Sequence, residues 1–251
     1  MWTKLLSGCL FAERCRVCRE FCQGEDVHFA REDPCLKRTE HGSVTEEPRA
    51  VCASCWWEFG GGRPLVEWLT VNADTAVKIA SGDCYRGAMK RLVYKLKYDG
   101  DRLLAADLAK LLVAAWPMVA DAGGGIPAVL VPVPLHWKRQ WKRGFNQAEL
   151  LARHVGHTLR LPVDAQALRR VRETDAQHGL GRQERLANLA AAFQGNRPRL
   201  SGRCVVLVDD AYTSGATLAE AARTVLASGA QSVVGLTLAR AILSNRLPAD
   251  L

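Results

Sequence analysis

The chain has 251 residues, 48% of them hydrophobic and 24% charged, a balance typical of one folded soluble domain or one domain with a small module. The net charge of +8 is compatible with phosphate, nucleic-acid or lipid-surface partners and does not choose among them. No apolar run approaches the roughly 20 residues of a membrane-spanning helix, so no membrane partner is expected.

The first residues contain a motif that mimics a secretion signal. Leu6-Ser7-Gly8-Cys9 resembles a lipoprotein cleavage box, but almost no apolar stretch precedes it. A signal peptide needs about 7–15 apolar residues before its cleavage site. We therefore expect a cytoplasmic protein.

Nine cysteines in a reducing compartment favour metal binding over disulfides. They include two CxxC pairs, Cys15 with Cys18 and Cys52 with Cys55. Each pair can bring two thiolates to one ion, and two pairs complete a tetrahedral Zn²⁺ shell. Other candidate ligands lie in or beside the long polar segment between the pairs: Cys22, His28, Cys35 and His41. The alternative is that all nine cysteines are free thiols.

A glycine-rich break separates the cysteine region from the rest of the chain. Gly60-Gly61-Gly62 and Pro64 interrupt regular structure, and no internal repeat follows. We predict a division near residue 75. Residues 1–75 then form a zinc-binding module with a polar insertion, and residues 76–251 form an α/β domain.

Apolar periodicity alternates between helix and strand after residue 76. Residues 89–116 are predicted to form two helices joined by a turn at Asp99-Gly100. The remaining predictions are strands over 128–134, 204–210 and 232–240, and helices over 146–159 and 217–230, the last stopped by Gly229. This alternation favours a mostly parallel sheet covered by helices, with a ligand at the carboxyl ends of the strands.

One such end carries a concentration of polar groups. Asp209 and Asp210 follow the apolar run 205–208, and a turn over 211–215 leads into a helix that begins near Thr217. Free N–H groups and a partial positive charge at a helix N-terminus favour an anion. Hydroxyls are supplied by Thr213, Ser214 and Thr217, and Gly215 allows close backbone approach.

Two adjacent carboxylates beside an anion site indicate a ligand with two chemical parts. They would repel a phosphate but can accept hydrogen bonds from the vicinal hydroxyls of a sugar. A ribose 5-phosphate fits both parts. Two other phosphate-binding motifs are absent from the sequence, the P-loop motif GxxxxGK[ST] and the dinucleotide-binding motif GxGxxG. The alternative interpretation of the two acids is an acidic helix cap after a core strand.

Residues 205–218, VVLVDDAYTSGATL, resemble the phosphoribosyl pyrophosphate (PRPP) signature of type I phosphoribosyltransferases. The stretches 94–101, 131–152 and 169–193 narrow the resemblance to the ComF family, the competence protein F group, whose zinc module the paired CxxC motifs also resemble. The resemblance covers nearly the whole chain except about 23–50. It implies a type I phosphoribosyltransferase fold over 76–251, a mostly parallel sheet flanked by helices, with a small N-terminal zinc-binding module. It also implies a link to DNA uptake or to the handling of imported DNA.

The resemblance also implies roles for individual residues. Asp209 and Asp210 would hold the ribose hydroxyls of PRPP and residues 213–217 its 5-phosphate. The full binding set is Asp209, Asp210, Ala211, Tyr212, Thr213, Ser214, Gly215, Ala216 and Thr217. The pyrophosphate, usually carrying Mg²⁺, would meet Lys138, Arg139, Lys142 and Arg143. A loop over 172–188 would close over the reacting centre through Thr174, Gln177, Arg182, Arg185 and Asn188, with Gln177, Arg182 and Arg185 as the catalytic candidates.

The segment HWKRQWKRGF, residues 136–145, supports a second interpretation. Trp137 and Trp141, with basic residues between them, resemble a stacking and charge strip for single-stranded nucleic acid. Aromatic residues four apart more often face a core, so we expect the tryptophans to pack against the sheet edge. We expect His136 and His178 to be solvated loop residues.

Two functions of different classes follow. In the first, the protein is a phosphoribosyltransferase that moves the ribosyl group of PRPP to an unidentified nucleophile, such as a nucleobase or an amine. In the second, it binds PRPP or a nucleotide without chemistry and acts as an adaptor for single-stranded DNA or DNA-processing proteins.

Overall fold

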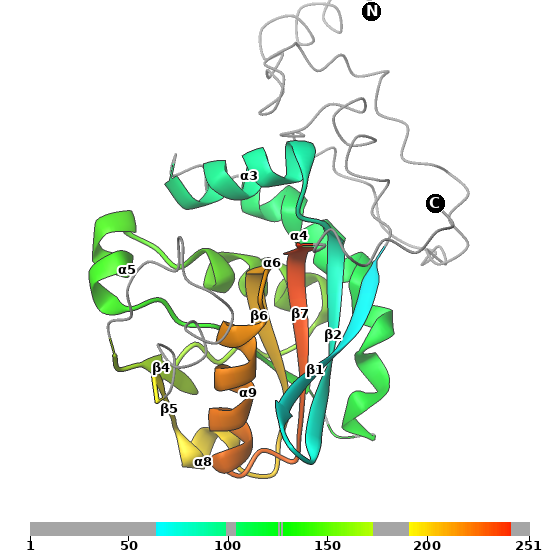
Figure 1. Cartoon of the computed structure of the whole chain (residues 1–251), viewed down its shortest axis with the longest axis vertical. Coiled ribbons are helices and arrows are strands. Elements are labelled where there is room, and N and C mark those ends of the chain that lie inside the picture. The colour runs from blue at the N-terminus through cyan, green and yellow to red at the C-terminus, as the bar shows by residue number, and fades with distance from the viewer. Residues whose placement is uncertain (1–63, 99–103, 125, 127, 173–190, 242–251) are drawn as a thin grey trace, which may run out of the picture.

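The computed structural model describes residues 64–98, 104–124, 126, 128–172 and 191–241. Its centre is a five-stranded sheet in the order β1-β2-β7-β6-β3 (Figure 1). In this sheet β1 runs antiparallel to its neighbour, and the other pairings are parallel. The bounds are β1 Leu65–Asn72, β2 Thr75–Cys84, β3 Ala128–Pro132, β6 Cys204–Tyr212 and β7 Ser232–Arg240.

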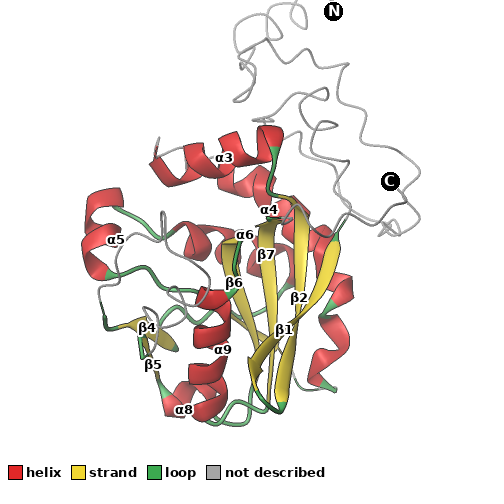
Figure 2. Ribbon diagram, in the orientation of Figure 1, coloured by secondary structure: helices red, strands yellow, loops and turns green. Residues whose placement is uncertain are grey.

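Helices cover both faces of this sheet (Figure 2). One face packs against α3 (Gly87–Tyr98), α4 (Leu104–Ala115) and α6 (Gln147–Leu159), and the other packs against α9 (Ala216–Ala227). The smaller elements are η1 Trp116–Met118, η2 Ala120–Gly123, α5 Trp137–Arg143, α8 Arg197–Leu200 and a two-stranded ladder of β4 Leu168–Arg170 with β5 Phe193–Gly195. None of the helices described has both the length and the apolar character needed to cross a membrane.

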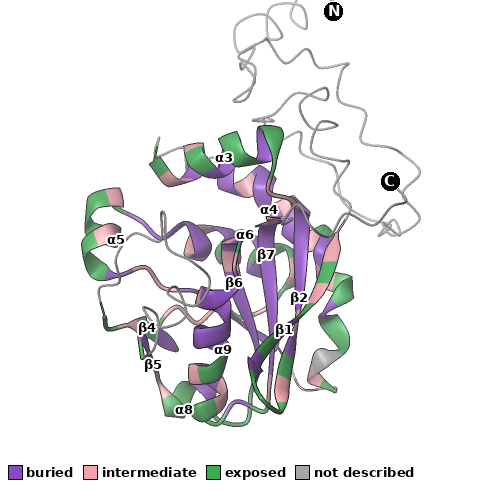
Figure 3. Cartoon of the chain, in the orientation of Figure 1, coloured by how far each residue is buried: buried purple, intermediate pink, exposed green. Residues whose placement is uncertain are grey.

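The central strand β6 is a run of apolar, mostly β-branched residues because both of its faces are buried. Successive side chains point to opposite sides. Val206 and Val208 belong to the core beneath α4 and α6, and Val205 and Leu207 belong to the core beneath α9. Figure 3 shows the resulting buried centre of the sheet. Because the two cores pack against both faces of β6, they also fix the position of its carboxyl end.

The sequence correctly predicts the mixed α/β class, with a mostly parallel sheet flanked by helices. It also predicts α3, α4, α6, α9, β3, β6 and β7 close to their observed bounds. Asn146 caps α6 by accepting a hydrogen bond from the Ala148 amide at 3.0 Å. Gly229 follows α9 with φ of +94°, the left-handed conformation expected of a helix stop. The predicted turn at Asp99-Gly100 lies outside the described residues.

Strands β1 and β2 are not among the elements predicted from the sequence. In β1 the side chains of Leu69 and Val71 are buried while those of Trp68 and Thr70 are exposed, a two-residue alternation that is visible in the sequence. The antiparallel pairing runs from Leu65 with Ser81 to Asn72 with Thr75, so the division predicted near residue 75 falls inside a hairpin. Residues 65–72 therefore belong to the sheet. The predicted zinc-binding module lies almost entirely outside the described residues.

Candidate functional site

The candidate site is the turn between β6 and α9, called here the β6–α9 turn and comprising residues 213–215. Strand β6 continues beyond the predicted end at Asp210 and stops at Tyr212, and α9 begins at Ala216. The extension follows from parallel pairing with β7, in which Tyr212 lies opposite Arg240. Both carboxylates thus belong to the strand and are held by its ladder.

Gly215 is required in this turn for packing as well as for conformation. Its φ is +76°, and a Cβ there would lie 2.8 Å from Tyr212 Cε2 and 2.9 Å from Leu69 Cδ1. A larger residue would therefore be strained and would collide with the ring and with β1. Ser214 Oγ accepts a hydrogen bond from the Ala216 amide at 3.4 Å, which closes the turn.

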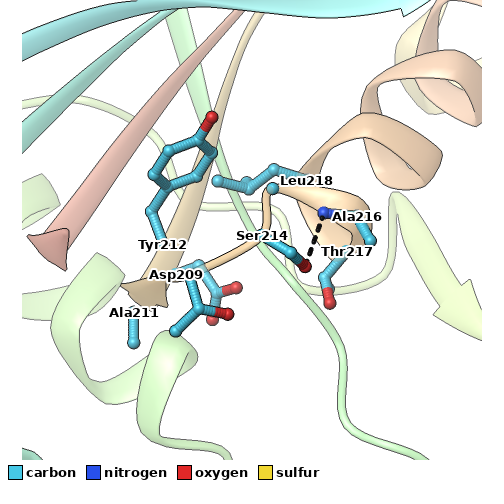
Figure 4. Close-up of a pocket in the computed structure, with 9 residues that line it drawn as sticks. Asp209, Ala211, Tyr212, Ser214, Ala216, Thr217 and Leu218 are labelled. Carbon is cyan, nitrogen blue, oxygen red and sulfur yellow. Dashed lines mark hydrogen bonds between the residues drawn. The ribbon is translucent and has the colours of Figure 1, made fainter. Parts of the chain in front are cut away.

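A pocket opens at this turn, and its lining nearly coincides with the predicted ligand-binding set. It is lined by Asp209, Ala211, Tyr212, Thr213, Ser214, Gly215, Ala216, Thr217 and Leu218. In Figure 4 the Asp209 carboxylate lies on the same side of the turn as the hydroxyls of Ser214 and Thr217, while the Tyr212 ring points away. A carboxylate, hydroxyls and the start of a helix therefore converge on one space, as the sequence predicts. Asp210 does not line it.

Asp210 points to the opposite face of β6, as expected for the next residue of a strand. It is 3% exposed, and its Oδ1 lies 2.8 Å from Lys97 Nζ at the end of α3. Its other oxygen is buried and has no hydrogen-bond partner among the described residues. The two adjacent carboxylates therefore have different surroundings.

Burial and the charge of Asp210 dominate the electrostatics of Asp209. Burial and the negative charge of Asp210 raise the pKa of Asp209 to about 7, against the opposing effect of Lys97 and Arg170. Burial lowers the pKa of Lys97, but its contacts with Asp210 and the charge of Asp209 outweigh burial, so this pKa is raised. Lys97 therefore carries its charge at neutral pH.

Arg170 on β4 connects the carboxylates to the basic helix α5. Burial and then the charge of Arg139 lower the pKa of Arg170, whereas the charge of Asp209 raises it. The guanidinium also lies 5.5 Å from the Phe193 ring centroid. Arg170 is therefore within electrostatic reach of both Arg139 on α5 and Asp209 on β6.

The four predicted cations of α5 divide into two kinds. Arg139 and Arg143 are half-buried, whereas Lys138 and Lys142 are exposed. Arg143 lies 4.8 Å from the Tyr98 ring centroid and donates to Gln147 Oε1 at 3.1 Å. Arg143 therefore ties α5 to α3 and to α6.

The predicted packing of the two tryptophans is wrong. Trp137 and Trp141 are 64% and 85% exposed, and α5 buries none of its residues. They lie on a seven-residue helix that carries them outward. The solvated loop predicted for His136 is also wrong, because that residue is 4% exposed at the start of α5. His178 lies outside the described residues.

Several predicted site residues are not covered by the structure. The loop candidates Thr174, Gln177, Arg182, Arg185 and Asn188 lie outside the described residues, as do Cys15, Cys18, Cys52, Cys55 and the other candidate zinc ligands. Among the residues that the structure does describe, no group of three or more His, Cys, Asp or Glu side chains is arranged to hold a metal ion.

Lys97 and Arg170 are not predicted site residues, although both lie in stretches that resemble the ComF family. The only signal in the sequence that could have identified them is a cationic side chain within a stretch that resembles the family. Asp83 is likewise not a predicted site residue. Asp83 lies at the end of β2 on the same edge of the sheet, is 5% exposed, and accepts a hydrogen bond from the Cys84 amide at 2.6 Å.

Sequence similarity to known proteins shows the family of this chain. No protein-family model matches the chain. DNA utilization protein YhgH of Salmonella typhi is 37% identical over 166 residues, which span 66% of this chain and 73% of that protein. Competence protein F of Haemophilus influenzae is 35% identical over 156 residues, which span 60% of this chain and 67% of that protein. This chain belongs to the ComF family.

A second competence protein and one solved structure are also similar to parts of this chain. The ComF chain is 32% identical over 162 residues to Competence protein ComFC of Bacillus subtilis, covering 62% of this chain and 61% of that protein. Among solved structures, the protein TT1426 from Thermus thermophilus aligns with a TM-score of 0.32 and 16% identity, over 57% of this chain and 86% of that chain. That structural similarity is too low to support an argument about the fold.

Asp83 yields a prediction about stability and pH. Burial raises its pKa to about 6 from an ordinary value of 3.8, so the native state binds more protons than the unfolded state between these values. Stability therefore falls as pH rises from about 4 to about 7. Asp83→Asn removes this penalty and should raise the free energy of unfolding by about 1–3 kcal/mol at pH 8. Urea denaturation measures the difference.

The same comparison at pH 4 should show little difference between Asp83→Asn and wild type, because both side chains are then neutral in the folded protein. Asp121→Asn, the same change on an exposed acid of η2, is the control. A stabilisation by Asp83→Asn that is equal at pH 4 and pH 8 would contradict the titration of Asp83.

Proposed function

We propose that this ComF protein binds PRPP at the β6–α9 turn and has the type I phosphoribosyltransferase fold. The pocket lined by Asp209 and residues 211–218 supports this proposal most directly. It combines an acceptor for sugar hydroxyls with hydroxyl donors and the start of α9, which is 12 residues long. A free phosphate needs no carboxylate, and a free sugar needs no helix N-terminus.

The pyrophosphate of PRPP would lie towards α5 and β4. Lys138, Arg139, Lys142 and Arg143 on α5 supply cations, and Arg170 couples electrostatically to both Arg139 and Asp209. A carboxylate turn beside a basic helix suits a pyrophosphate that carries Mg²⁺, which would neutralise part of the ligand charge. The exposed Lys138 and Lys142 side chains could adjust to the ligand.

The proposed reaction is transfer of the ribosyl group. The bond from ribose C1 to the pyrophosphate oxygen breaks, and pyrophosphate leaves with the electron pair. A nucleophilic nitrogen of a nucleobase or amine forms the new bond to C1 and loses its proton. Preorganised cations around the leaving group stabilise the charge that develops on it, with Gln177, Arg182 and Arg185 proposed to close over the centre.

We also propose a role in the use of DNA. Two relatives are named competence proteins and a third a DNA utilization protein, and these names describe those proteins. The exposed aromatic and basic surface of α5 supports direct contact of this chain with single-stranded DNA. Tyr94 and Tyr98 of α3 extend that surface, since both are more than half exposed and their ring centroids lie 4.7 Å apart.

The PRPP proposal is tested by isothermal titration calorimetry with Mg²⁺ present. Ribose 5-phosphate should compete with PRPP, whereas free ribose should compete poorly. The double variant Asp209→Asn with Asp210→Asn should bind PRPP about tenfold or more weakly, because a charge-assisted hydrogen bond contributes about 1.5–3 kcal/mol. Asp121→Asn should bind as wild type does. No heat at millimolar PRPP, or unchanged affinity in the double variant, would show that the ligand assignment is wrong.

The N-terminal cysteines carry a separate proposal, a structural Zn²⁺ held by Cys15, Cys18, Cys52 and Cys55. Purified protein should contain about one zinc per chain, and Cys15→Ser or Cys55→Ser should lose it, because one missing thiolate opens a closed tetrahedral shell. Cys84→Ser, which changes a half-buried cysteine at the end of β2, should keep the metal. Elemental analysis decides, and freshly purified protein without zinc would refute the proposal.

The DNA surface is tested by fluorescence anisotropy with a labelled single-stranded oligonucleotide. Trp137→Ala combined with Trp141→Ala should weaken binding by about 1–3 kcal/mol per lost base stack. Trp68→Ala is a matched control because Trp68 is 65% exposed on β1, at the opposite edge of the sheet from β3 and α5. Equal affinity of the folded double variant and wild type would leave α5 only its proposed pyrophosphate role.

A further inference from the structure

The ion pair between Lys97 and Asp210 joins α3 to the candidate ribose site. Lys97 Nζ lies 2.8 Å from Asp210 Oδ1, and the two side chains are 21% and 5% exposed. Removing one partner of a buried ion pair leaves the other charge uncompensated, so Asp210 depends on Lys97. The negative partner, Asp210, is adjacent in sequence to Asp209, the carboxylate that lines the pocket.

We propose that Lys97 is a positioning residue of the ribose site, which holds Asp210 away from the β6–α9 turn so that Asp209 is the carboxylate that meets the ribose. This inference rests on the proposed PRPP site and gives the two carboxylates different roles. Asp209 lines the pocket, and Asp210 lies on the opposite face of β6 against Lys97.

The local geometry keeps the two carboxylates apart. Asp209 Oδ1 accepts a hydrogen bond from the Asp210 amide at 2.8 Å, which orients Asp209 and uses one of its oxygens. Asp210 is 3% exposed, so its ionised form has little access to water and relies on Lys97. Loss of Lys97 would remove the cation that contacts Asp210 and that also acts on Asp209.

The charge of Lys97 also acts on Asp209. Burial and Asp210 raise the pKa of Asp209, and Lys97 and Arg170 oppose that rise. Arg139 acts in turn on Arg170, and Tyr85 acts on Lys97. Without Lys97 the Asp209 carboxyl should hold its proton to a higher pH, and a protonated carboxyl is a poorer acceptor for ribose hydroxyls.

The first measurement needs no ligand. The titration of the Asp209 carboxyl is followed by carbon-13 NMR of aspartate-labelled protein, with Asp209→Asn used for assignment. Lys97→Met should move the titration midpoint to higher pH, and Lys97→Arg should restore it because the charge returns. Lys90→Met removes a charge from an exposed position of the same helix and should leave the midpoint unchanged.

The second measurement is PRPP affinity by calorimetry between pH 6 and pH 9. An upward shift of about one pH unit in the Asp209 midpoint reduces its ionised fraction near pH 7 from about one half to about one tenth. Lys97→Met should therefore bind PRPP about fivefold more weakly at pH 7 and approach wild type by pH 9. A purely structural role would weaken binding without this pH profile.

Two outcomes would overturn the inference. If Lys97→Met weakens PRPP binding equally at every pH and leaves the Asp209 midpoint in place, Lys97 either acts only structurally or contacts the ligand directly. If Asp210→Asn alone weakens binding as much as Asp209→Asn alone, both carboxylates meet the ribose. Asp210→Asn should instead lower the Asp209 midpoint and weaken binding less. The comparison of Asp209→Asn with Asp210→Asn keeps the test decisive if Lys97→Met does not fold.

The failure of this inference can be distinguished from failure of the proposed function. If wild-type protein binds no PRPP but Lys97→Met still moves the Asp209 midpoint, the PRPP site is refuted and the effect of Lys97 on Asp209 stands. If wild-type protein binds PRPP but the Asp209 midpoint does not move in Lys97→Met, the PRPP site stands and the role of Lys97 is refuted.

Discussion

Two adjacent carboxylates at the end of β6, Asp210 buried and Asp209 half-buried at the pocket, are the constraint on which the candidate site depends. Asp210 has little access to water, and burial and the charge of Asp210 disfavour ionisation of Asp209. The structure separates them by the alternation of the strand and supplies Lys97 from α3 and the charge of Arg170 from β4. The positions of α3 and β4 are therefore part of the electrostatics of the site, although both elements lie far from β6 in the sequence.

The same end of the sheet holds the β6–α9 turn through packing. Leu69 of β1 and the Tyr212 ring occupy the space beside Gly215, so the turn depends on a strand at the opposite end of the described chain. Arg223 of α9 contributes by donating to the Val71 carbonyl at 2.8 Å and by pairing with Glu220. Glu220 in turn accepts a hydrogen bond from the Ala191 amide at 2.8 Å. These contacts tie α9 to β1 and to the chain entering β5, and they fix where the first turn of α9 points.

The two proposed activities use neighbouring surfaces of one molecule. Arg143 contacts the Tyr98 ring and thereby joins α5 to α3, the helix that also carries Lys97. Lys97 faces inward towards Asp210, while Tyr94 and Tyr98 on the same helix are exposed. An amphipathic helix can present one face to the carboxylates and the other to solvent. Helix α3 thus connects the proposed PRPP site to the proposed DNA surface.

The sequence by itself determined the α/β class, most of the elements after residue 76 and the residues of the β6–α9 turn. These features are encoded locally, in apolar periodicity, in Gly229, and in the succession of strand, acids, hydroxyls and glycine. The tertiary structure decided what depends on contacts distant in sequence. It placed Lys97 beside Asp210, brought Arg170 towards Asp209 and packed Leu69 against the turn. It also decided which way α5 faces, because a spacing of four residues defines one face of a helix without saying whether that face meets a core or solvent.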